Sequence, residues 1–293
     1  MATIAFCGLG MMGVAMATRL REAGHNVRAW NRSSDKTKAW AAGGGVACDT
    51  PEVAAQGASQ AHLMVADDTA VEAIIFGAHG LVAGLSPQSL VADHSTVSVA
   101  GTKDRAGRLI RGGFRYIHAP VFAGPPQVAK GEGLMLIGGD EKNYAEVQVT
   151  LHQILAKHFV IGEKPEDAAA FKLMGNSMLV SINEGLAEFF AIATTSGISP
   201  QRAFSLFESF DSTGTIARRG PRMVAGDYKP PTFTLSMAHK DVLLMLQAAG
   251  NRNVPALKII EEKMQRLIAQ GYADLDMSAL AADVIPPHGG GAH

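Results

Sequence analysis

Few cysteines, little net charge and no long apolar run mark this sequence, and each shortage excludes a class of protein. Two cysteines, Cys7 and Cys48, cannot build a multi-disulfide framework. A formal net charge of −1, without a basic stretch interleaved with aromatic residues, argues against nucleic acid as the main partner. No run approaches the roughly 18–20 apolar residues that span a membrane, and no cationic segment precedes an apolar one at the N-terminus. We therefore expect a cytoplasmic protein that binds neither nucleic acid nor a membrane.

The sequence does have a G-x-G-x-x-G turn, between a predicted strand at residues 4–8 and a predicted helix at 14–23. Gly8 would allow the tight turn, Gly10 would let a pyrophosphate approach the backbone, and Gly13 would let the helix pack close to the strand. The free N–H groups at the start of the helix would then bind phosphate. This context predicts a dinucleotide site, and an ordinary glycine turn without a ligand is the alternative. The predicted cofactor contacts of the turn are Gly8, Leu9, Gly10, Met11, Met12 and Gly13.

The order of the predicted elements changes near residue 164. Before this point, short apolar strands alternate with helices, which is typical of a parallel sheet covered on both faces. After it only helical patterns follow, and the first runs over residues 165–196. We therefore predict an α/β Rossmann domain at residues 1–163, an all-α domain at 164–285 that begins with a long interdomain helix, and a disordered tail at 286–293.

The end of the second predicted strand, residues 26–31, bears on the choice of dinucleotide. In NAD sites an acidic residue about 20 positions after the glycines binds a ribose hydroxyl. Here the strand ends in Asn31, Arg32 and Ser33, with Lys36 one helical turn later, and no acidic residue occupies that end. Arginine can donate two parallel hydrogen bonds to a ribose 2′-phosphate. We predict NADP(H), with NAD(H) as the alternative cofactor and a solvated cationic turn as the alternative interpretation.

Lys172 and Asn176 lie four residues apart in the long predicted helix and therefore on one face. The residues around them are mostly apolar or small, so the lysine either extends to solvent or is held in a cleft. In a cleft, desolvation would lower the lysine pKa toward a range that suits proton transfer. Asn176 would then hydrogen-bond a substrate oxygen beside it.

A series of short motifs follows a fixed order along nearly the whole chain. They are the glycine turn at residues 8–13, Asp93-His94-Ser95-Thr96, Ala119-Pro120-Val121 with the loop after it, the segment GEGLMLIGG at 131–139, Lys172-x-x-x-Asn176 and Lys240-Asp241. Together they resemble the β-hydroxyacid dehydrogenase family, which includes 3-hydroxyisobutyrate dehydrogenases, tartronate semialdehyde reductases and glyoxylate/succinic semialdehyde reductases. The Asn31-Arg32-Ser33 ending resembles the NADP-using branches of this family.

The resemblance implies a role for each matching residue. Lys172 would give a proton to the carbonyl oxygen as hydride arrives from the nicotinamide, and Asn176 would position the substrate. Cofactor contacts would come from Val65 and Ala66 along the cofactor backbone, from Thr96 near the nicotinamide and from Lys240 of the helical domain. Substrate contacts would come from Ser95, Phe122, Ala123, Gly124 and Phe233.

One loop departs from the family pattern. The family has Ser-Gly-Gly there, and holds the substrate carboxylate through a hydroxyl and backbone N–H groups. This chain has Phe122, Ala123 and Gly124, so the hydroxyl is lost and a bulky ring is gained. The change indicates a more apolar or differently shaped substrate. Alternatively, Phe122 points into the core and a carboxylate still binds the backbone.

Together these features predict an NADP(H)-dependent oxidoreductase that reduces a small aldehyde or keto acid, or oxidises the matching hydroxy acid, with Lys172 as general acid/base. One alternative is an imine reductase or reductive aminase, a related group that commonly has an acidic residue or Tyr in place of this lysine. Another is a non-catalytic NADP-binding module, in which the lysine is usually lost. No metal site is expected. The long helix has apolar residues on more than one face and family relatives are often dimers or tetramers, so a homo-oligomer is expected.

Overall fold

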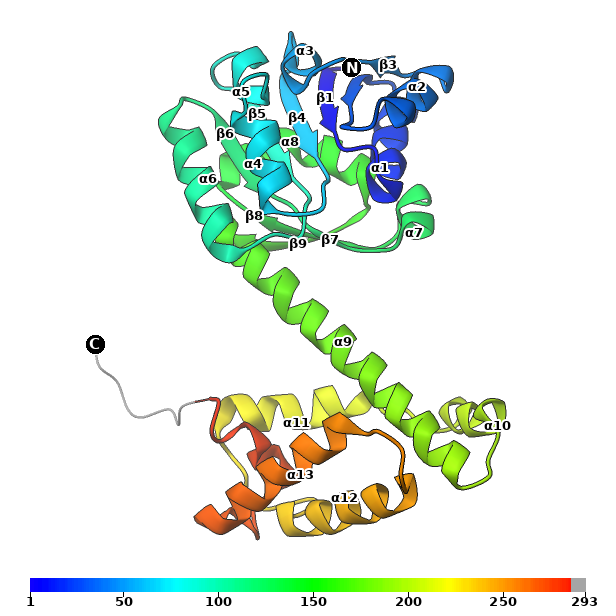
Figure 1. The fold of residues 1–293 in the computed structure, drawn as a ribbon. Helices are drawn as coiled ribbons and strands as arrows, with labels where there is room; N and C mark the ends of the chain where they lie inside the picture. Colours follow the sequence, from blue (N-terminus) through cyan, green and yellow to red (C-terminus); the bar gives the residue numbers. More distant parts are fainter. Residues whose placement is uncertain (286–293) are drawn as a thin grey trace, which may run out of the picture. The chain divides into compact units, whose positions relative to one another are not determined.

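The computed structural model describes residues 1–285, which fall into two compact units that divide after Ser177 (Figure 1). The predicted domain boundary at 163 and 164 lies just before the long helix α9, Pro165–Thr195, so the prediction and the contact-based division differ in where they assign the start of this helix. The predicted disordered tail, residues 286–293, lies outside the described residues.

The first unit contains one sheet. Its strands are β1 Thr3–Cys7, β2 Asn26–Trp30, β3 Val46–Ala47, β4 Gln60–Leu63, β5 Leu90–Asp93, β6 Arg115–His118, β7 Val121–Phe122, β8 Leu134–Gly138 and β9 Lys157–Gly162. They lie in the order β3-β2-β1-β4-β5-β6-β8-β7, with β9 paired to β8. The strands from β3 to β6 run parallel, whereas β8 is antiparallel to β6 and β7. The chain direction across the sheet reverses between β1 and β4, and in such sheets ligands bind at that position, outside the carboxyl ends of the strands.

Helices cover both faces of this sheet (Figure 1). They are α1 Met11–Glu22, α2 Ser34–Ala42, α3 Pro51–Ala55, α4 Asp68–Phe76, α5 Leu81–Gly84, α6 Val99–Arg111, α7 Pro125–Ala129 and α8 Glu141–Ile154. Successive residues of β1 point to opposite faces, as strand geometry requires. Ile4 and Phe6 pack in a cluster with residues of α1 and α8, while Ala5 and Cys7 pack in a second cluster with residues of α4 and α6. The predicted parallel sheet covered on both faces is confirmed.

The second unit is helical. After α9 its helices are α10 Pro200–Phe204, α11 Gly214–Ala225, α12 Leu235–Ala249 and α13 Pro255–Leu267, with short turns η1 Ser205–Glu208, η2 Ile268–Tyr272 and η3 Met277–Ala281. Leu235 and Val242 of α12 pack with Met264 and Leu267 of α13 in its core. Helix α13 has no side-chain cap at its N-terminus. Instead, the buried carboxylate of Glu188 on α9 accepts hydrogen bonds from the N–H groups of Ala256 and Leu257 in the first turn of α13. The predicted α/β domain followed by an all-α part is confirmed.

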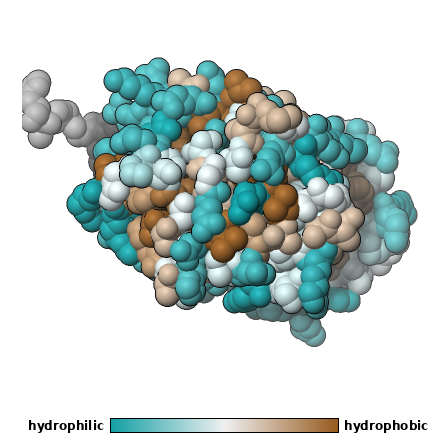
Figure 2. Space-filling model, turned by 90° about the horizontal axis from the view of Figure 1, so that it is seen from above, coloured by the Kyte–Doolittle hydropathy of each residue, from teal (hydrophilic) through white to brown (hydrophobic). Residues whose placement is uncertain are grey.

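The surface is mixed in character. The face shown in Figure 2 is bordered by hydrophilic side chains, with small hydrophobic groups scattered between them. Among residues 1–285, none of the helices combines the length and apolar character that crossing a membrane requires.

Candidate active site

A cavity of about 600 Å³ opens at the carboxyl ends of β1, β2 and β4. It lies where the chain direction across the sheet reverses, which is the position that ligands occupy in this kind of sheet. The cavity brings together most of the predicted cofactor contacts of the first unit, namely Gly8, Gly10, Met11, Met12, Gly13, Asn31, Arg32, Ser33, Lys36, Val65 and Ala66. It is also lined by residues that the sequence patterns do not single out, including Asp67, Thr69 and Ala70 at the start of α4.

The three glycines of the turn differ in their surroundings. Gly8 has a φ of +100°, and a Cβ there would lie 2.3 Å from the Met64 carbonyl oxygen. A Cβ at Gly13 would lie 1.8 Å from the Gly8 carbonyl oxygen, so only glycine lets α1 approach the strand this closely. A Cβ at Gly10 would meet nothing within 4 Å. The space beside Gly10 therefore faces the cavity, where a ligand can approach the backbone and the uncapped start of α1.

The residues that follow β2 include one that holds the glycine turn in place and two cations at the edge of the cavity. The Leu9 N–H donates to Asn31 Oδ1 at 2.8 Å, so Asn31 ties the glycine turn to β2, and Leu9 itself is buried behind the turn. Arg32, Ser33 and Lys36 are exposed and line the same part of the cavity. Two cations at one end of an otherwise largely apolar cavity form a place for an anionic group.

The segment that follows β4, residues 64–67, is held in place by a hydrogen bond to Ser95. The Val65 N–H donates to Ser95 Oγ at 3.0 Å, and the Ser95 N–H donates to Asp93 Oδ1 at 2.8 Å. Ser95 is fully buried, so the structure gives this predicted substrate contact a bracing role, while Thr96 next to it is half-buried. Burial raises the pKa of Asp93 to about 6, and hydrogen bonds from Ser95 and the nearby charge of Arg105 oppose that rise.

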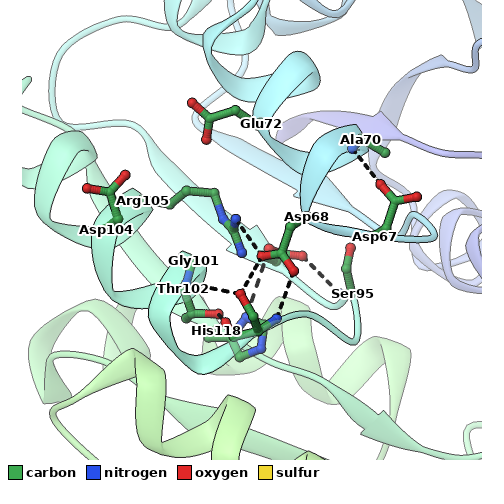
Figure 3. A network of polar contacts seen from close by, with 12 residues as sticks. Asp67, Asp68, Ala70, Glu72, Ser95, Gly101, Thr102, Asp104, Arg105 and His118 are labelled. Carbon is green, nitrogen blue, oxygen red and sulfur yellow. Dashed lines mark hydrogen bonds and ion pairs between the residues drawn. The ribbon is translucent and has the colours of Figure 1, made fainter.

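The other end of this segment is held by a buried arginine (Figure 3). Arg105 of α6 is 2% exposed, and its Nη1 donates to Asp68 Oδ1 at 2.8 Å. Asp68 opens α4 and also accepts the Ser98 N–H at 2.9 Å. Burial would raise the pKa of Asp68, but the hydrogen bonds from Ser98 and Arg105 outweigh it and keep this pKa below its usual range. Residues 64–67 border the cavity, and this segment is thus held at Val65 and by the adjacent Asp68.

Lys172 is buried in the first unit and does not extend to solvent. It is 8% exposed, its Nζ donates to the Val121 carbonyl oxygen at 2.8 Å, and it lies 4.0 Å from the centroid of the Phe122 ring. Desolvation by burial lowers the pKa of this lysine. Asn176, one turn further along α9, is half-buried.

Two glycines of the segment GEGLMLIGG at residues 131–139 allow the close packing that brings α9, with Lys172, next to the Phe122 loop. A Cβ at Gly138 of β8 would lie 2.8 Å from the Cβ of Ala168, so glycine lets the first turn of α9 pack directly on the sheet. A Cβ at Gly133 would lie 2.6 Å from the Cβ of Ala123, so glycine also lets the loop after β7 pack against β8. The segment therefore places α9 and the Phe122 loop next to each other.

The Phe122 loop offers fewer donors than its sequence suggests. The Gly124 N–H, a predicted contact for a substrate carboxylate, donates to Gln127 Oε1 of α7. Ala123 packs partly into the core of the first unit, whereas Phe122 is half-buried and lies at Lys172. The Phe122 ring thus lies between Lys172 and Gly175 of α9.

The remaining predicted contacts belong to the second unit. Phe233 precedes α12 and packs at the edge of that unit's core. Lys240 of α12 is exposed, and its Nζ lies 2.8 Å from Asp241 Oδ1. Within residues 1–285, no group of three or more His, Cys, Asp or Glu side chains is arranged to hold a metal ion.

Comparisons with known proteins agree with this geometry. The family model described as the NAD binding domain of 6-phosphogluconate dehydrogenase matches residues 3–162, and the one described as the NAD-binding domain of NADP-dependent 3-hydroxyisobutyrate dehydrogenase matches residues 167–284. The chain is 28% identical to 2-hydroxy-3-oxopropionate reductase of Escherichia coli, over 94% of this chain and 95% of the relative. It is 28% identical to glyoxylate/succinic semialdehyde reductase 1 of Arabidopsis thaliana, over 94% and 96%.

Solved structures show the same fold. An imine reductase from Myxococcus stipitatus in complex with NADP+ has a TM-score of 0.88 at 17% identity, covering 95% of this chain and 98% of that one. Taken together, the matching family models, the relatives along the whole chain and the glycine-turn cavity show that this chain belongs to the β-hydroxyacid dehydrogenase family of NAD(P)-dependent oxidoreductases.

Proposed function

We propose that this protein is an NADP(H)-dependent oxidoreductase that reduces a small aldehyde or keto acid, or oxidises the matching hydroxy acid. The observation that carries the proposal is the buried Lys172, whose ammonium donates to the Val121 carbonyl oxygen inside the nucleotide-binding unit. Relatives named as a 2-hydroxy-3-oxopropionate reductase and a glyoxylate/succinic semialdehyde reductase support this substrate class.

The cavity at the glycine turn fits a nicotinamide dinucleotide. The open space at Gly10 and the uncapped start of α1 suit a pyrophosphate, and Arg32 with Lys36 suits a ribose 2′-phosphate. When bound, this cofactor supplies or accepts the hydride. Val65 and Ala66 would border its backbone, and their position is fixed by the hydrogen bond of Val65 to Ser95.

Proton transfer is the step of the reaction that a residue of this chain would catalyse. In reduction, Lys172 Nζ gives a proton to the carbonyl oxygen, and in oxidation it takes a proton from the hydroxyl. Burial lowers the pKa of Lys172 and so eases the release of this proton. Asn176, four residues later on the same face of α9, would orient the substrate oxygen, and Thr96 would lie near the nicotinamide.

The Phe122 loop favours a substrate with an apolar group beside its carbonyl. The family hydroxyl is absent, the Gly124 N–H already binds Gln127, and an aromatic ring lies at Lys172. The same features would suit an imine, so reductive amination or imine reduction is a second candidate. The fold that the chain shares with imine reductases is compatible with this candidate, although the lysine favours carbonyl chemistry.

The test is consumption of NADPH, with NADH alongside, in the presence of short aldehydes, keto acids and preformed cyclic imines. We expect turnover of at least one aldehyde or keto acid with NADPH preferred. Turnover of imines alone would replace the first candidate by the second. Tight NADPH binding without turnover of any compound would contradict both and leave a non-catalytic NADP-binding module.

We further propose that the protein is a homo-oligomer in a reducing, cytoplasmic environment. Both cysteines, Cys7 and Cys48, are buried as free thiols. Large apolar side chains of α9 are exposed along much of its length. Such a surface favours association with a second copy.

A further inference from the structure

The ring that replaces the family hydroxyl occupies a defined position. The Phe122 ring packs against Gly175 of α9, where an added Cβ would lie 2.2 Å from its Cζ and 2.8 Å from its Cε1. This contact therefore depends on the absence of a side chain at position 175. The Lys172 ammonium lies 4.0 Å from the centroid of the same ring.

Two short pieces of chain supply all the groups involved. Strand β7 contributes the Val121 carbonyl, which accepts from Lys172 Nζ at 2.8 Å, and the adjacent Phe122 ring. Helix α9 contributes Lys172 and Gly175, which are three residues apart and thus neighbours on its surface. The contact of the ring with Gly175 fixes where the ring lies relative to the ammonium.

The carbonyl and the ring act on the lysine in the same direction. A carbonyl oxygen and the negative face of an aromatic ring both stabilise an ammonium over a neutral amine. Burial acts in the opposite direction and lowers the lysine pKa. A buried lysine without these two contacts would lose its proton more readily than this one.

We propose that Phe122 and Gly175 form an ammonium clamp, in which the ring packed against Gly175 holds Lys172 protonated beside the Val121 carbonyl. Phe122 is then a positioning residue that exchanges no proton itself. The inference rests on the proposed function, in which Lys172 gives the proton to the substrate. It assigns a role to the residue at which this chain departs from its family.

The protonation of Lys172 can be measured without any substrate. The protein is labelled with trace acetic anhydride over a range of pH values, and acetylation of the peptide that contains Lys172 is followed by mass spectrometry. Phe122→Leu keeps an apolar side chain but removes the ring. Gly175→Ala displaces the ring and leaves it in the protein, and alanine strengthens rather than weakens a helix. We expect the labelling midpoint to fall by ~0.5–1 pH unit in each variant.

A matched control tests whether the loss of another aromatic ring near α9 also lowers the labelling midpoint of Lys172. Phe159 of the same unit pairs with Phe171 of α9, at a centroid distance of 6.1 Å, and Phe159→Leu should leave the midpoint of Lys172 unchanged. Melting temperatures of all variants show that each is folded. If Phe122→Leu does not fold, Gly175→Ala still tests the clamp.

The outcomes separate the clamp from the proposed function. An unchanged midpoint in Phe122→Leu would overturn the clamp, and so would a shift in Phe122→Leu with none in Gly175→Ala. Inactivity toward every carbonyl would remove the proposed function without moving the labelling midpoint. With an active enzyme, the pH above which kcat/KM for reduction declines should move down by the same ~0.5–1 unit in both variants.

Discussion

At the scale of single residues, Lys172 combines two properties that rarely occur together in a lysine. It is almost fully buried, and its ammonium has a carbonyl oxygen as its hydrogen-bond partner and no carboxylate among the partners that the described residues provide. A structural lysine would be expected to pair with an acid when buried this far. The arrangement is better suited to a group that must release and regain a proton.

Lys172→Ala should therefore abolish turnover while leaving the affinity for NADPH nearly unchanged. Loss of general acid/base catalysis costs about 10²–10⁴-fold in rate, and Lys172 is not among the residues that line the cofactor cavity. Turnover is followed by NADPH consumption and affinity by fluorescence titration. Lys142→Ala, at an exposed lysine of α8, is the control and should behave as the wild type. Turnover retained in Lys172→Ala would remove this lysine from the mechanism.

In the proposed NADP(H) site, Arg32 is the residue that we expect to bind the ribose 2′-phosphate. It is exposed at the rim of the cavity, where a 2′-phosphate would lie. Arg32→Ala should weaken NADPH binding by about 10–100-fold, the value of a charge-assisted hydrogen bond, and should change NADH binding little. Both affinities are measured by titration. Lys38→Ala, on α2 just after Arg32 and outside the cavity lining, is the control. Equal losses for the two cofactors in Arg32→Ala would contradict the 2′-phosphate assignment.

At the scale of elements, the segment between β4 and α4 depends on its anchors. Arg105→Met removes the ion pair with Asp68 and should raise the Kd for NADPH several-fold, because residues 64–67 then lose one of their two anchors. Loss of this partner should also cost about 1–3 kcal/mol of unfolding free energy, less than for a fully buried pair because Asp68 is partly exposed. Thermal unfolding and NADPH titration measure the two effects.

Arg108 on the same helix is a matched control for this experiment. It pairs with Glu72 of α4 and with Asp104, but all three side chains are at least a third exposed. Arg108→Met should therefore change stability much less than Arg105→Met and leave the NADPH affinity unchanged. An Arg105→Met protein that binds NADPH as tightly as the wild type would show that the Asp68 anchor does not position the cavity.

Two buried histidines connect β4 to the residues that follow β5 and β6. His94 donates from Nδ1 to the Ala119 carbonyl oxygen at 2.8 Å, so its Nε2 must accept from His62 Nδ1 at 3.0 Å while both rings are neutral. A proton on His94 Nε2 would face the N–H of His62. Burial accordingly lowers the pKa of His94 to about 4, and burial together with the neighbouring ring lowers that of His62 well below its usual value.

These lowered pKa values fix the sign of a pH effect on stability. Between pH ~6.5 and ~4 the unfolded chain binds protons at these histidines and the folded chain does not, so stability falls as the pH is lowered. Asp93, with a pKa raised to about 6, acts in the opposite sense in this window and offsets part of the loss. The buried His118, whose pKa burial lowers to about 3, adds to the loss. We expect a net loss of a few kcal/mol from pH 7 to pH 5, measured by denaturant unfolding. His94→Asn should reduce this slope, and an identical slope would exclude His94 as its cause.

The sequence predicts these elements unevenly, and the reasons are physical. Strands with continuous apolar residues, such as β1 and β5, stand out because both of their faces are buried. β3 and β7 have two residues each and offer no pattern, and much of β9 is exposed. α11 is not predicted because it contains Gly214, Gly220 and Pro221, which are poor helix formers.

Some features of the candidate site can likewise be predicted from local sequence, whereas others depend on contacts between distant residues. The glycine turn and the cationic end of β2 are local signals, and both line the cavity. Arg105 gives no such signal, because a charged residue on a helix is normally a surface residue and its burial depends on packing against distant strands. The Phe122 departure is visible in the sequence, whereas its contact with Gly175, more than 50 positions later, is a property of the fold.

At the scale of the whole molecule, the exposed apolar residues of α9 bear on assembly. Met174, Met178 and Ile182 follow one another at helical spacing, each about half exposed, and Leu179 and Val180 lie on other faces of the helix. Single exposed apolar residues are ordinary, but monomeric proteins rarely expose a continuous apolar stripe. A second copy of the chain is the simplest partner that would cover it.

Sedimentation equilibrium should accordingly give a mass of two or four chains, each of 30.7 kDa. Met178→Lys together with Ile182→Lys places two charges in the stripe and should shift the equilibrium toward the monomer, because a buried unpaired charge costs several kcal/mol. Ile110→Lys, at an exposed apolar residue of α6, is the control and should leave the mass unchanged. A wild-type protein that sediments as a monomer at micromolar concentration would contradict the homo-oligomer.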